Sequence, residues 1–490
     1  MALAALDAWE NGEIRLSRSL WDTLQREALG DAESTVRPGA GVLFCGITRT
    51  SRGTRLLGRE FVRAADGVDY VDSDVGHGAL TPGFTLDAAL RAESEGLIPL
   101  FLHGHGGDKN VGFSPTDLDS HERGYPALVL NANGPVGALV LARRAVDIDL
   151  FLPGGARVRV RRALVVGPTV ERFHANPPDT ALPRRATDRQ TRLFGADGLE
   201  VLAKSKVAVI GGGGIGMLAI QWLSMLGVGE LVLIEPGRIK QENRTRLPGA
   251  TRWDAAGGDR ERRGPEMILR SLGLVGTKKV NLAKRLARKA AMGTKVTTLR
   301  TMVSDPAVLR QLVDSDFIVL AADSDSARYA ANRVAHQYLV PVIQAGTKVQ
   351  RREDASVADV FAVVRPVLPD QGCLRCAGLY SSAGLSYETV VGIGGGQRDY
   401  GTGEPAPSVV GLNAVAASLA VSFVQFWLTG LRRANSADNL FVYPLDDVLQ
   451  AGCSVRDSSC PTCGDGGVTG WGDLRPLRIP SPRVTKKSGD

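Results

Sequence analysis

The sequence predicts an α/β protein in which a Rossmann-like, doubly wound sheet is preceded by a smaller α+β domain. From residue 199 onward, apolar strand-like runs alternate with helices, which is the pattern of a parallel sheet. Before residue 167 the apolar runs are mostly short and separated by turns, which favours an α+β arrangement. The chain has 490 residues, 43% hydrophobic and 23% charged, so its composition is that of a globular protein and excludes a disordered or fibrous chain.

The first domain is expected to cover residues 1–167. A helix is predicted at 84–96, because an amphipathic run there ends at Gly96. Strands are predicted wherever an apolar run is bounded by turn residues, at 41–47, 54–62, 97–103, 127–133, 137–144 and 156–166. A Pro-rich, polar linker is expected at 168–188.

The second domain is expected to cover residues 189–466, and a flexible tail the Gly-, Pro- and Lys/Arg-containing residues 467–490. Its predicted strands and helices alternate as in a series of βαβ units, with strands at 206–210, 230–235, 316–322 and 340–346 and the first helix at 217–229. The apolar segment 408–430 contains Asn413 and Gln425, so we expect a buried core helix rather than a membrane span.

The overall charge and the cysteine content limit the possible partners and compartment. A net charge of +7 without a dense basic stripe suits an acidic partner or a nucleotide better than a nucleic acid. The N-terminus lacks the pattern of a signal peptide, and four of the six cysteines form two CxxC pairs. We therefore expect a cytoplasmic protein that binds neither nucleic acid nor membranes.

A group of possible metal ligands follows the predicted strand 97–103. His103 and His105 are two residues apart at the end of a strand, so both rings can point to one side. Asp117 comes a dozen residues later and can complete the group. Two histidines, one carboxylate and a water are a ligand set of catalytic zinc, although two loop histidines without an ion would show the same HxH pattern.

These residues resemble the JAB/MPN (JAMM) metallopeptidase family, which has an HxH, a following Ser-x-x-Asp and an upstream Glu. The resemblance implies that His103, His105 and Asp117 hold catalytic zinc, that Ser114 stabilises the oxyanion, and that ubiquitin-like tags are trimmed or removed. At the place of the upstream Glu the sequence has residues 37–40, Arg-Pro-Gly-Ala, and Glu60 is the nearest substitute. An inactive, binding-only domain is the alternative.

A glycine-rich loop marks the second domain. Gly211, Gly213 and Gly216 fit G-x-G-x-x-G, and Gly214 adds a further residue without a side chain. Such a loop between a strand and a helix lets phosphates approach backbone amides. Glu235 ends the next predicted strand, where a carboxylate can bind ribose hydroxyls.

Further residues distinguish a triphosphate from a dinucleotide. Asn243 and Arg246 follow the strand that ends at Glu235, Lys279 precedes a basic helix, and Asp323 follows an apolar strand. Several cations and a carboxylate for Mg²⁺ are what a triphosphate needs. Finally, the two CxxC pairs, Cys373 with Cys376 and Cys460 with Cys463, are typical of a closed, structural zinc site.

Residues 185–466 resemble the ThiF/MoeB/ubiquitin-activating family. The matching motifs are an N-terminal RQ…LFG signature that begins at Arg189, the glycine loop, Asn243 and Arg246, Lys279, Asp323 and the two CxxC pairs. The resemblance implies that Arg189, Arg246, Lys279 and Mg²⁺ on Asp323 surround the phosphates of ATP, with Arg189 often reaching across a homodimer.

The same resemblance implies the reaction, which is adenylation of the C-terminal carboxylate of a ubiquitin-like protein that ends in Gly-Gly. A conjugating enzyme or a sulfur donor would be the next partner. The sequence has no Cys between Cys376 and Cys453, so we expect transfer to an external nucleophile rather than a thioester on this chain. A non-catalytic scaffold for ubiquitin-like proteins and an NAD-dependent oxidoreductase are the alternatives.

Overall fold

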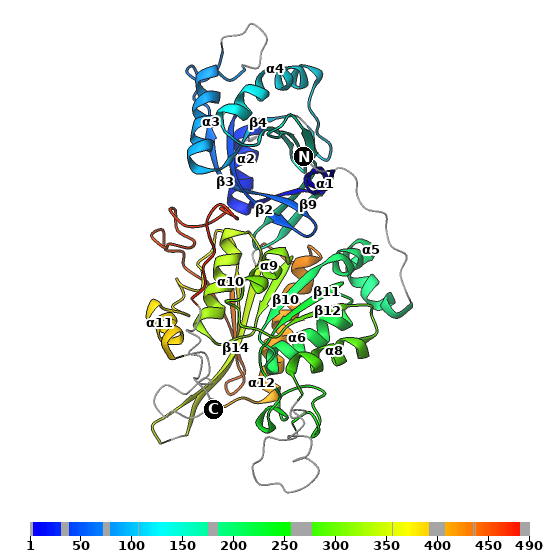
Figure 1. Ribbon diagram of the computed structural model, residues 1–490. Helices are drawn as coiled ribbons and strands as arrows, with labels where there is room; N and C mark the ends of the chain where they lie inside the picture. Colours follow the sequence, from blue (N-terminus) through cyan, green and yellow to red (C-terminus); the bar gives the residue numbers. More distant parts are fainter. Residues whose placement is uncertain are drawn as a thin grey trace, which may run out of the picture. The chain divides into compact units, whose positions relative to one another are not determined.

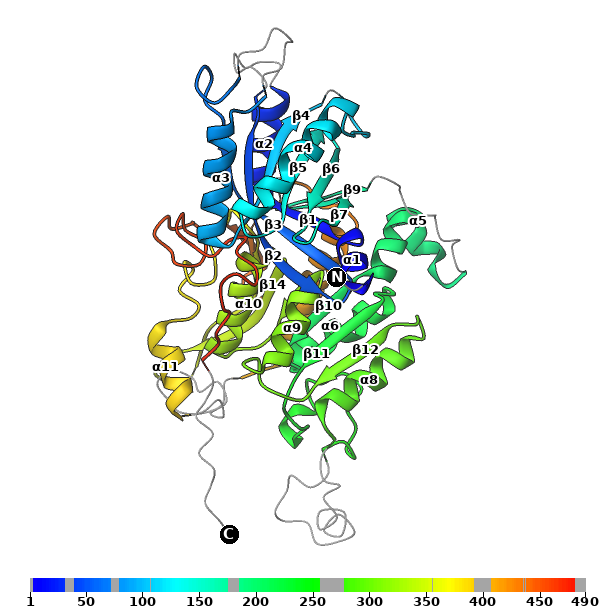
Figure 2. The same cartoon turned by 45° about the horizontal axis from the view of Figure 1, so that its top comes forward.

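The computed structural model describes residues 3–30, 39–71, 79–105, 107–174, 185–255, 277–354, 356–391, 407–434, 436 and 438–480. The chain divides into two compact units (Figures 1 and 2). Unit 1 comprises residues 1–179, 336–339 and 467–477, and unit 2 comprises residues 180–335, 340–466 and 478–490. Unit 1 is therefore built from three separate stretches of the chain.

Unit 1 contains a nine-stranded mixed sheet in the order β7-β6-β5-β4-β2-β3-β1-β8-β9. Its elements are α1 (Leu3–Glu10), β1 (Glu13–Ser17), α2 (Arg18–Leu29), β2 (Gly41–Thr50), β3 (Gly53–Arg63), α3 (Pro82–Glu95), β4 (Ile98–Gly104), α4 (Pro115–Asn131), β5 (Val136–Ala142), β6 (Ala145–Phe151), β7 (Arg157–Val160), β8 (Arg162–Val166) and β9 (Val170–His174).

Two apolar clusters pack the unit 1 helices α2 and α3 against the strands of the sheet. Trp21, Leu24 and Ala28 of α2 are buried with side chains of β1 and β4–β6, whereas Ala88, Ala89 and Ala92 of α3 are buried with Phe44 and Phe101 in a separate cluster. The alternation of side chains along a strand directs successive residues to opposite faces, so β2 and β4 contribute to both clusters. Helix α3 ends at Gly96, which adopts a left-handed conformation with φ of 73°.

One predicted strand is wrong. Residues 127–133 form the last turns of α4 and the segment that follows it, not a strand. Leu128 and Val129 pack against the cluster that contains α3, while Leu130 is exposed. A short apolar run has the same appearance in a strand and in a helix, and only the packing decides between them. The predicted strand 156–166 is in fact two strands, β7 and β8.

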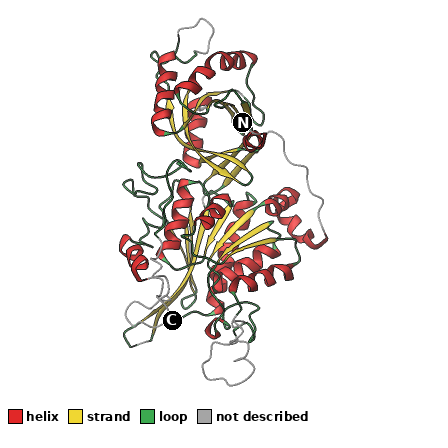
Figure 3. Ribbon diagram, viewed as in Figure 1, coloured by secondary structure: helices red, strands yellow, loops and turns green. Residues whose placement is uncertain are grey.

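Unit 2 is an α/β domain, and Figure 3 shows its strands with helices beside them. Its sheet has eight strands in the order β12-β11-β10-β13-β14-β15-β16-β17. Its elements are α5 (Asp188–Lys204), β10 (Lys206–Ile210), α6 (Gly214–Met225), β11 (Glu230–Ile234), α8 (Lys279–Ala290), β12 (Lys295–Leu299), α9 (Pro306–Asp314), β13 (Phe317–Leu320), α10 (Asp325–Gln337), β14 (Val342–Arg351), β15 (Val357–Val367), α11 (Ser382–Val391), α12 (Val410–Leu428), β16 (Asn439–Tyr443) and β17 (Val448–Gly452), with short 3₁₀ turns at Arg185–Thr187 and Gln241–Asn243.

The five strands β12, β11, β10, β13 and β14 are parallel, and the remaining three pairings are antiparallel. The strand order reverses at β10, because the chain first runs outward to β11 and β12 and then returns to β13 and β14 on the other side. This is the Rossmann-like, doubly wound arrangement that the sequence predicts, and ligands of such sheets bind at the carboxyl ends of the strands where the order reverses.

Helix α12 lies across the sheet as a core helix. It contacts α6, β14 and β15, and Ala416, Ala420, Val424 and Trp427 are buried along it. By length and composition this helix would also qualify as a membrane span, and half of its most apolar window is buried in the structure. Burial against the sheet explains its apolar sequence.

Candidate functional site

The glycine loop lies between β10 and α6, at the point where the strand order reverses. Gly211 has a φ of +97°, and a Cβ there would lie 2.8 Å from the carbonyl oxygen of Ala321. A Cβ on Gly216 would lie 1.9 Å from the carbonyl oxygen of Gly211. Glycine is therefore required at the first and last positions of the motif, for the backbone conformation and for close packing of the helix on the strand.

The centre of the loop is open. A Cβ on Gly213 would meet no atom within 4 Å, and no side chain caps α6 at this residue. The backbone N–H groups of Gly213 and Gly214 have no acceptor among the described residues. The first N–H groups of a helix are unpaired within the helix and carry its positive end, so this loop can bind a phosphate.

Glu235 follows β11 and lies against the glycine loop. Its carboxylate accepts hydrogen bonds from the backbone N–H of Gly212 at 2.7 Å and of Gly237 at 2.6 Å. The ammonium group of Lys279, the first residue of α8, is 3.4 Å from the same carboxylate. Two of the residues predicted for the nucleotide site, Glu235 and Lys279, thus lie together beside the glycine loop, with Glu235 only 7% exposed.

Asn243 and Arg246 belong to the segment after β11. The side-chain oxygen of Asn243 accepts a hydrogen bond from the backbone N–H of Lys240, and the backbone N–H of Arg246 donates to the carbonyl oxygen of Asn243. The Arg246 carbonyl lies beside Gly214, 3.3 Å from the position of a Cβ there. The structure therefore brings this segment against the start of α6.

The buried Asn413 of α12 is a site residue that sequence reasoning missed. A Cβ on Gly214 would lie 2.4 Å from the Asn413 side-chain nitrogen, and the Asn413 side-chain oxygen is 3.3 Å from the Thr347 hydroxyl. Asn413 is 3% exposed, so its amide is directed into the protein next to the glycine loop. A polar residue inside an otherwise apolar helix was the available signal, because buried polar groups need partners.

Asp323 lies just beyond the carboxyl end of β13, where it is exposed. Helix α10 begins two residues later, and its first amides are capped from another helix. Glu388 of α11 accepts hydrogen bonds from the backbone N–H groups of Asp325 at 2.7 Å and Ser326 at 3.0 Å. Glu388, which the sequence did not single out, therefore holds the segment that carries Asp323.

Arg189 is not brought to this group within the chain. It is exposed near the start of α5, and among the described residues it has no hydrogen bond or ion pair with the loop, with Glu235 or with Lys279. The residues that the structure does assemble are those around the loop between β10 and α6.

The four CxxC cysteines of unit 2 form one cluster. The sulfur atoms of Cys373 and Cys376 are 3.7 Å apart, those of Cys373 and Cys460 3.7 Å, and those of Cys376 and Cys463 3.4 Å. Tetrahedral zinc with bonds of about 2.3 Å separates its sulfur ligands by about 3.8 Å, so the cluster fits a zinc ion. Burial raises the pKa of Cys376, and an ion would oppose this by stabilising the thiolates.

In unit 1, His103, His105 and Asp117 come together as the sequence predicts. The Nε2 atoms of the two histidines are 3.0 Å apart, and each is 3.6 Å from a carboxylate oxygen of Asp117. Burial lowers the pKa of His103, and Asp117 only partly offsets this. The ring is therefore neutral near pH 7 and its nitrogen can bind a metal ion, so the donor set and spacing fit zinc.

Ser114 lies beside these ligands as the N-cap of α4. Its backbone N–H and hydroxyl donate to the Asp117 carboxylate at 2.8 and 2.7 Å, and the Asp117 N–H donates back to the hydroxyl. This capping box fixes the direction of Asp117. Burial opposes ionisation of Asp117, but the hydrogen bonds from Ser114 outweigh it and lower the pKa of the carboxyl.

Glu60 does not lie with the histidines. It faces Phe44 across β2 and β3, and Phe44 faces Pro99 on β4, four residues before His103. At about 3.3 Å per residue and 4.8 Å per strand, Glu60 is roughly 16 Å from His103. Its carboxylate instead pairs with Arg91, 2.6 Å away. A general base must be within hydrogen-bond reach of the metal-bound water, so this geometry does not suit Glu60.

A second polar group lies behind the histidines. His121 of α4 is 2.8 Å from the carboxylate of Asp149, which also accepts hydrogen bonds from Arg157. Burial opposes ionisation of Asp149, but the hydrogen bonds from His121 and Arg157 outweigh it and lower its pKa to about 2. The ring of Phe113 lies between the two histidine groups, 6.2 Å from the His103 ring and 4.9 Å from the His121 ring.

Comparison with known proteins adds to this geometry. The model of the ThiF family matches residues 187–461, which is more than half of the chain and, apart from residues 336–339, lies within unit 2. The SAMP-activating enzyme E1 of Haloferax volcanii is 24% identical over 289 residues, which cover 57% of this chain and 88% of that protein.

Solved structures give a weaker likeness. MccB of E. coli, crystallised with ATP, is 20% identical and superposes with a TM-score of 0.42 over 59% of this chain and 76% of its own. The structure of PaaA is 18% identical and superposes with a TM-score of 0.41, over 56% of this chain and 85% of PaaA.

Proposed function

The chain belongs to the ThiF family, and on that premise we propose that unit 2 uses ATP to adenylate the C-terminal carboxylate of a ubiquitin-like protein. The single observation that supports this best is the loop between β10 and α6. The amides of Gly213 and Gly214, which have no acceptor in the part of the chain that the structure describes, lie beside Glu235, Lys279 and the segment of Arg246. The E1 likeness supports the choice of a ubiquitin-like substrate over a dinucleotide.

The residues around the loop have distinct roles in this proposal. The amides of Gly213 and Gly214 bind phosphate oxygens, and Glu235 accepts hydrogen bonds from the ribose. Lys279 and Arg246 neutralise charge that develops on the α-phosphate. Asp323 would hold Mg²⁺, which when bound supplies further positive charge to the phosphates. In a homodimer, Arg189 would contact the phosphates of the nucleotide that is bound to the partner copy.

The chemistry follows from the poor reactivity of a carboxylate. One carboxylate oxygen attacks the α-phosphorus, the bond to the bridging oxygen breaks, and pyrophosphate leaves. The resulting mixed anhydride has AMP as its leaving group, so an external sulfur or amine nucleophile, from a sulfur donor or a conjugating enzyme, can take the acyl group. The four-cysteine cluster would hold a structural zinc ion and takes no part in these bonds.

An exchange assay tests this function. In the presence of the ubiquitin-like partner, the protein should incorporate labelled pyrophosphate into ATP. Asp323→Ala should abolish the exchange, whereas Asp87→Ala, which changes an exposed carboxylate of α3, should not. Exchange that is unchanged in Asp323→Ala would overturn the assignment.

For unit 1 we propose a zinc-dependent peptidase that trims or removes the same partner. His103, His105 and Asp117 would hold the ion, which when bound lowers the pKa of a water molecule and makes it a nucleophile. Water adds to the scissile carbonyl, the C–N bond breaks, and the amine leaves with a proton. The hydroxyl of Ser114 lies beside the ligands and could donate to the oxyanion.

The position of Glu60 favours a second candidate for unit 1, which is a recognition module that binds metal without cleaving. No other carboxylate among the described residues forms an ion pair with His103 or His105. Metal analysis and cleavage distinguish the two roles. If unit 1 is a peptidase, His103→Ala should lose both the zinc ion of unit 1 and cleavage. If unit 1 is a recognition module, the unchanged protein should hold that zinc ion but cleave neither tailed nor conjugated substrates.

A further inference from the structure

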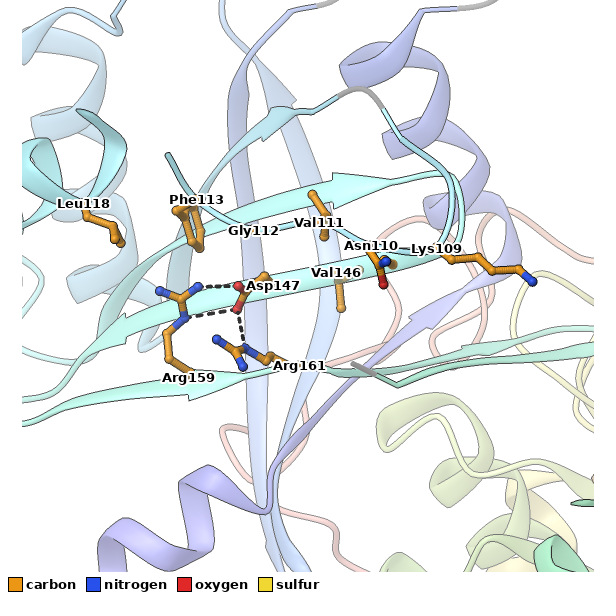
Figure 4. Close-up of a pocket in the computed structure, with 11 residues that line it drawn as sticks. Lys109, Asn110, Val111, Gly112, Phe113, Leu118, Val146, Asp147, Arg159 and Arg161 are labelled. Carbon is orange, nitrogen blue, oxygen red and sulfur yellow. Dashed lines mark hydrogen bonds and ion pairs between the residues drawn. The ribbon is translucent and has the colours of Figure 1, made fainter. Parts of the chain in front are cut away.

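A cavity of about 440 Å³ in unit 1 adjoins the candidate metal group and has no role in the functions proposed above. Phe113 and Leu118, neighbours of Ser114 and Asp117 in the sequence, form one part of its wall. Arg159 and Arg161 form another part, and Figure 4 shows both guanidinium groups directed toward Asp147. The cavity lies entirely within unit 1.

The charges in this cavity do not balance. Asp147 is 2% exposed, and among the described residues that line the cavity it carries the only negative group. Two guanidinium groups face it, with the Nε of Arg159 at 3.1 Å and the Nε of Arg161 at 3.4 Å. Lys109, at the other end of the cavity in Figure 4, adds a third cation. The excess of positive charge suits an anionic ligand.

Arg161 is the residue best placed to bind such a ligand. Its side chain is 54% exposed, and Asp147 is its one recorded partner among the described residues. That contact uses Nε, so the terminal nitrogens of the guanidinium group remain available. A guanidinium group binds a carboxylate through two parallel hydrogen bonds, which makes carboxylate recognition specific as well as strong.

The cavity is close enough to the metal group for one short peptide to reach both. The guanidinium carbon of Arg159 is 4.9 Å from the centre of the Phe113 ring, and the centre of the His103 ring is 6.2 Å from that of Phe113. Both distances are measured to the centre of the Phe113 ring, so the His103 ring centre and the guanidinium carbon of Arg159 are at most about 11 Å apart. An extended chain covers about 3.3–3.6 Å per residue, so two or three residues span this distance.

We propose that this cavity binds the free C-terminal carboxylate of a short peptide tail whose scissile bond lies at His103, His105 and Asp117. Arg161 is the specificity-determining residue, and Arg159, held by Asp147 and Phe113, forms the adjacent wall. The site selects a substrate that ends a few residues beyond the scissile bond. An isopeptide-linked protein, which has no carboxylate at that distance, is selected against. This inference rests on the proposed role of unit 1.

Binding and cleavage of two peptides test this inference with the full-length, zinc-loaded protein. Both probes are fluorescein-labelled and end in Gly-Gly followed by two alanines, one as the free acid and one as the C-terminal amide. Fluorescence anisotropy should give a Kd at least tenfold lower for the free acid, because a hydrogen bond between ionised groups is worth about 1.5–3 kcal/mol.

Arg161→Gln should remove this preference and leave the protein folded, because Asp147 keeps its pairing with Arg159. Arg123→Gln, an exposed change on α4, is the matched control and should keep the preference. Equal affinity for acid and amide, no binding of either peptide, or a preference that survives in Arg161→Gln would overturn the proposal.

Cleavage separates this proposal from the peptidase function. If both peptides are cleaved at equal rates, unit 1 is a peptidase and the carboxylate site is wrong. If neither is cleaved but the free acid binds more tightly in an Arg161-dependent way, the carboxylate site is supported and the peptidase function fails.

Discussion

The carboxylate of Glu235 accepts a hydrogen bond from the backbone N–H of Gly212 at 2.7 Å. This bond joins the end of β11 to the glycine loop, so the same residue orders the loop and faces the proposed ribose position. A Cβ on Gly212 would lie 2.9 Å from the Glu235 side chain, which leaves no room for another residue at position 212. Loop and carboxylate are thus fitted to each other before a nucleotide binds.

We therefore expect Glu235→Ala to weaken ATP binding. Loss of the ribose contacts and of the bond to Gly212 should raise the Kd for ATP by about tenfold to a hundredfold, since bonds to a charged group contribute about 1.5–3 kcal/mol. Calorimetric titration measures this directly. Glu353→Ala, at an exposed carboxylate outside the site, should bind ATP as the unchanged protein does, and a normal Kd in Glu235→Ala would contradict the assigned role.

The cap on α10 predicts a positioning role for Glu388. Glu388→Ala removes the acceptor of the Asp325 and Ser326 amides, which should displace Asp323 and slow pyrophosphate exchange by about tenfold to a hundredfold. Glu388→Gln keeps an acceptor oxygen and should retain more activity. If Glu388 had a purely structural role, both variants would have a lower thermal stability but would exchange pyrophosphate at the normal rate at 25 °C.

The four-cysteine cluster predicts one tightly held zinc ion. In Cys460→Ser we expect that ion to be lost and the thermal midpoint to fall by about 5–10 °C, because metal binding contributes to folding. Cys453→Ser is the matched control, since Cys453 is exposed and outside the cluster. Zinc content from elemental analysis and calorimetric melting check the prediction, and a zinc-free protein with unchanged melting would refute it.

We expect no thioester on this chain. Cys45 is wholly buried, and its burial raises the pKa of the thiol, which makes it a poor nucleophile. Four cysteines lie in the cluster, so Cys453 is the remaining thiol. Incubation with ATP and partner should give no thiol-sensitive adduct on a non-reducing gel. An adduct that disappears in Cys453→Ser would make Cys453 the acyl carrier.

The acid stability of unit 1 should depend on Asp149. Its pKa falls from an ordinary 3.8 to about 2 on folding, so the ionised form stabilises the native state above about pH 4. This contribution is lost as the pH falls from 4 toward 2, where the native carboxyl is protonated. Asp149→Asn should be less stable than the unchanged protein at pH 7, and the difference should shrink toward pH 2. Melting curves across this range measure it, and a constant difference would contradict the linkage.

The glycine loop and the cysteine cluster could be predicted because short sequence spacings define them. Gly211 to Gly216 follow one another from the end of β10 into the start of α6, and within each CxxC pair the two cysteines are only three residues apart. The strand ends that carry Glu235 and Asp323 follow from apolar runs, so their meeting at one edge of the sheet could also be anticipated.

Residues whose role depends on strand register could not be predicted. Glu60 was proposed as a base by proximity in the sequence, yet its register against Phe44 carries it away from His103. Helix packing likewise hid Asn413 and Glu388, which reach the loop and α10 from helices far along the chain. Sequence patterns give periodicity, but tertiary packing alone decides which segments meet.

The segment 467–477 was expected to be part of a tail, but it belongs to unit 1. Trp471 is 6% exposed, packs in the cluster that contains α3, and has the guanidinium groups of Arg59 and Arg475 about 4 Å from its ring. The ribosome must therefore translate the chain as far as this segment before the apolar cluster can be completed. Until then unit 1 exposes the surface that Trp471 covers, so a fragment that stops at residue 179 should be prone to aggregate.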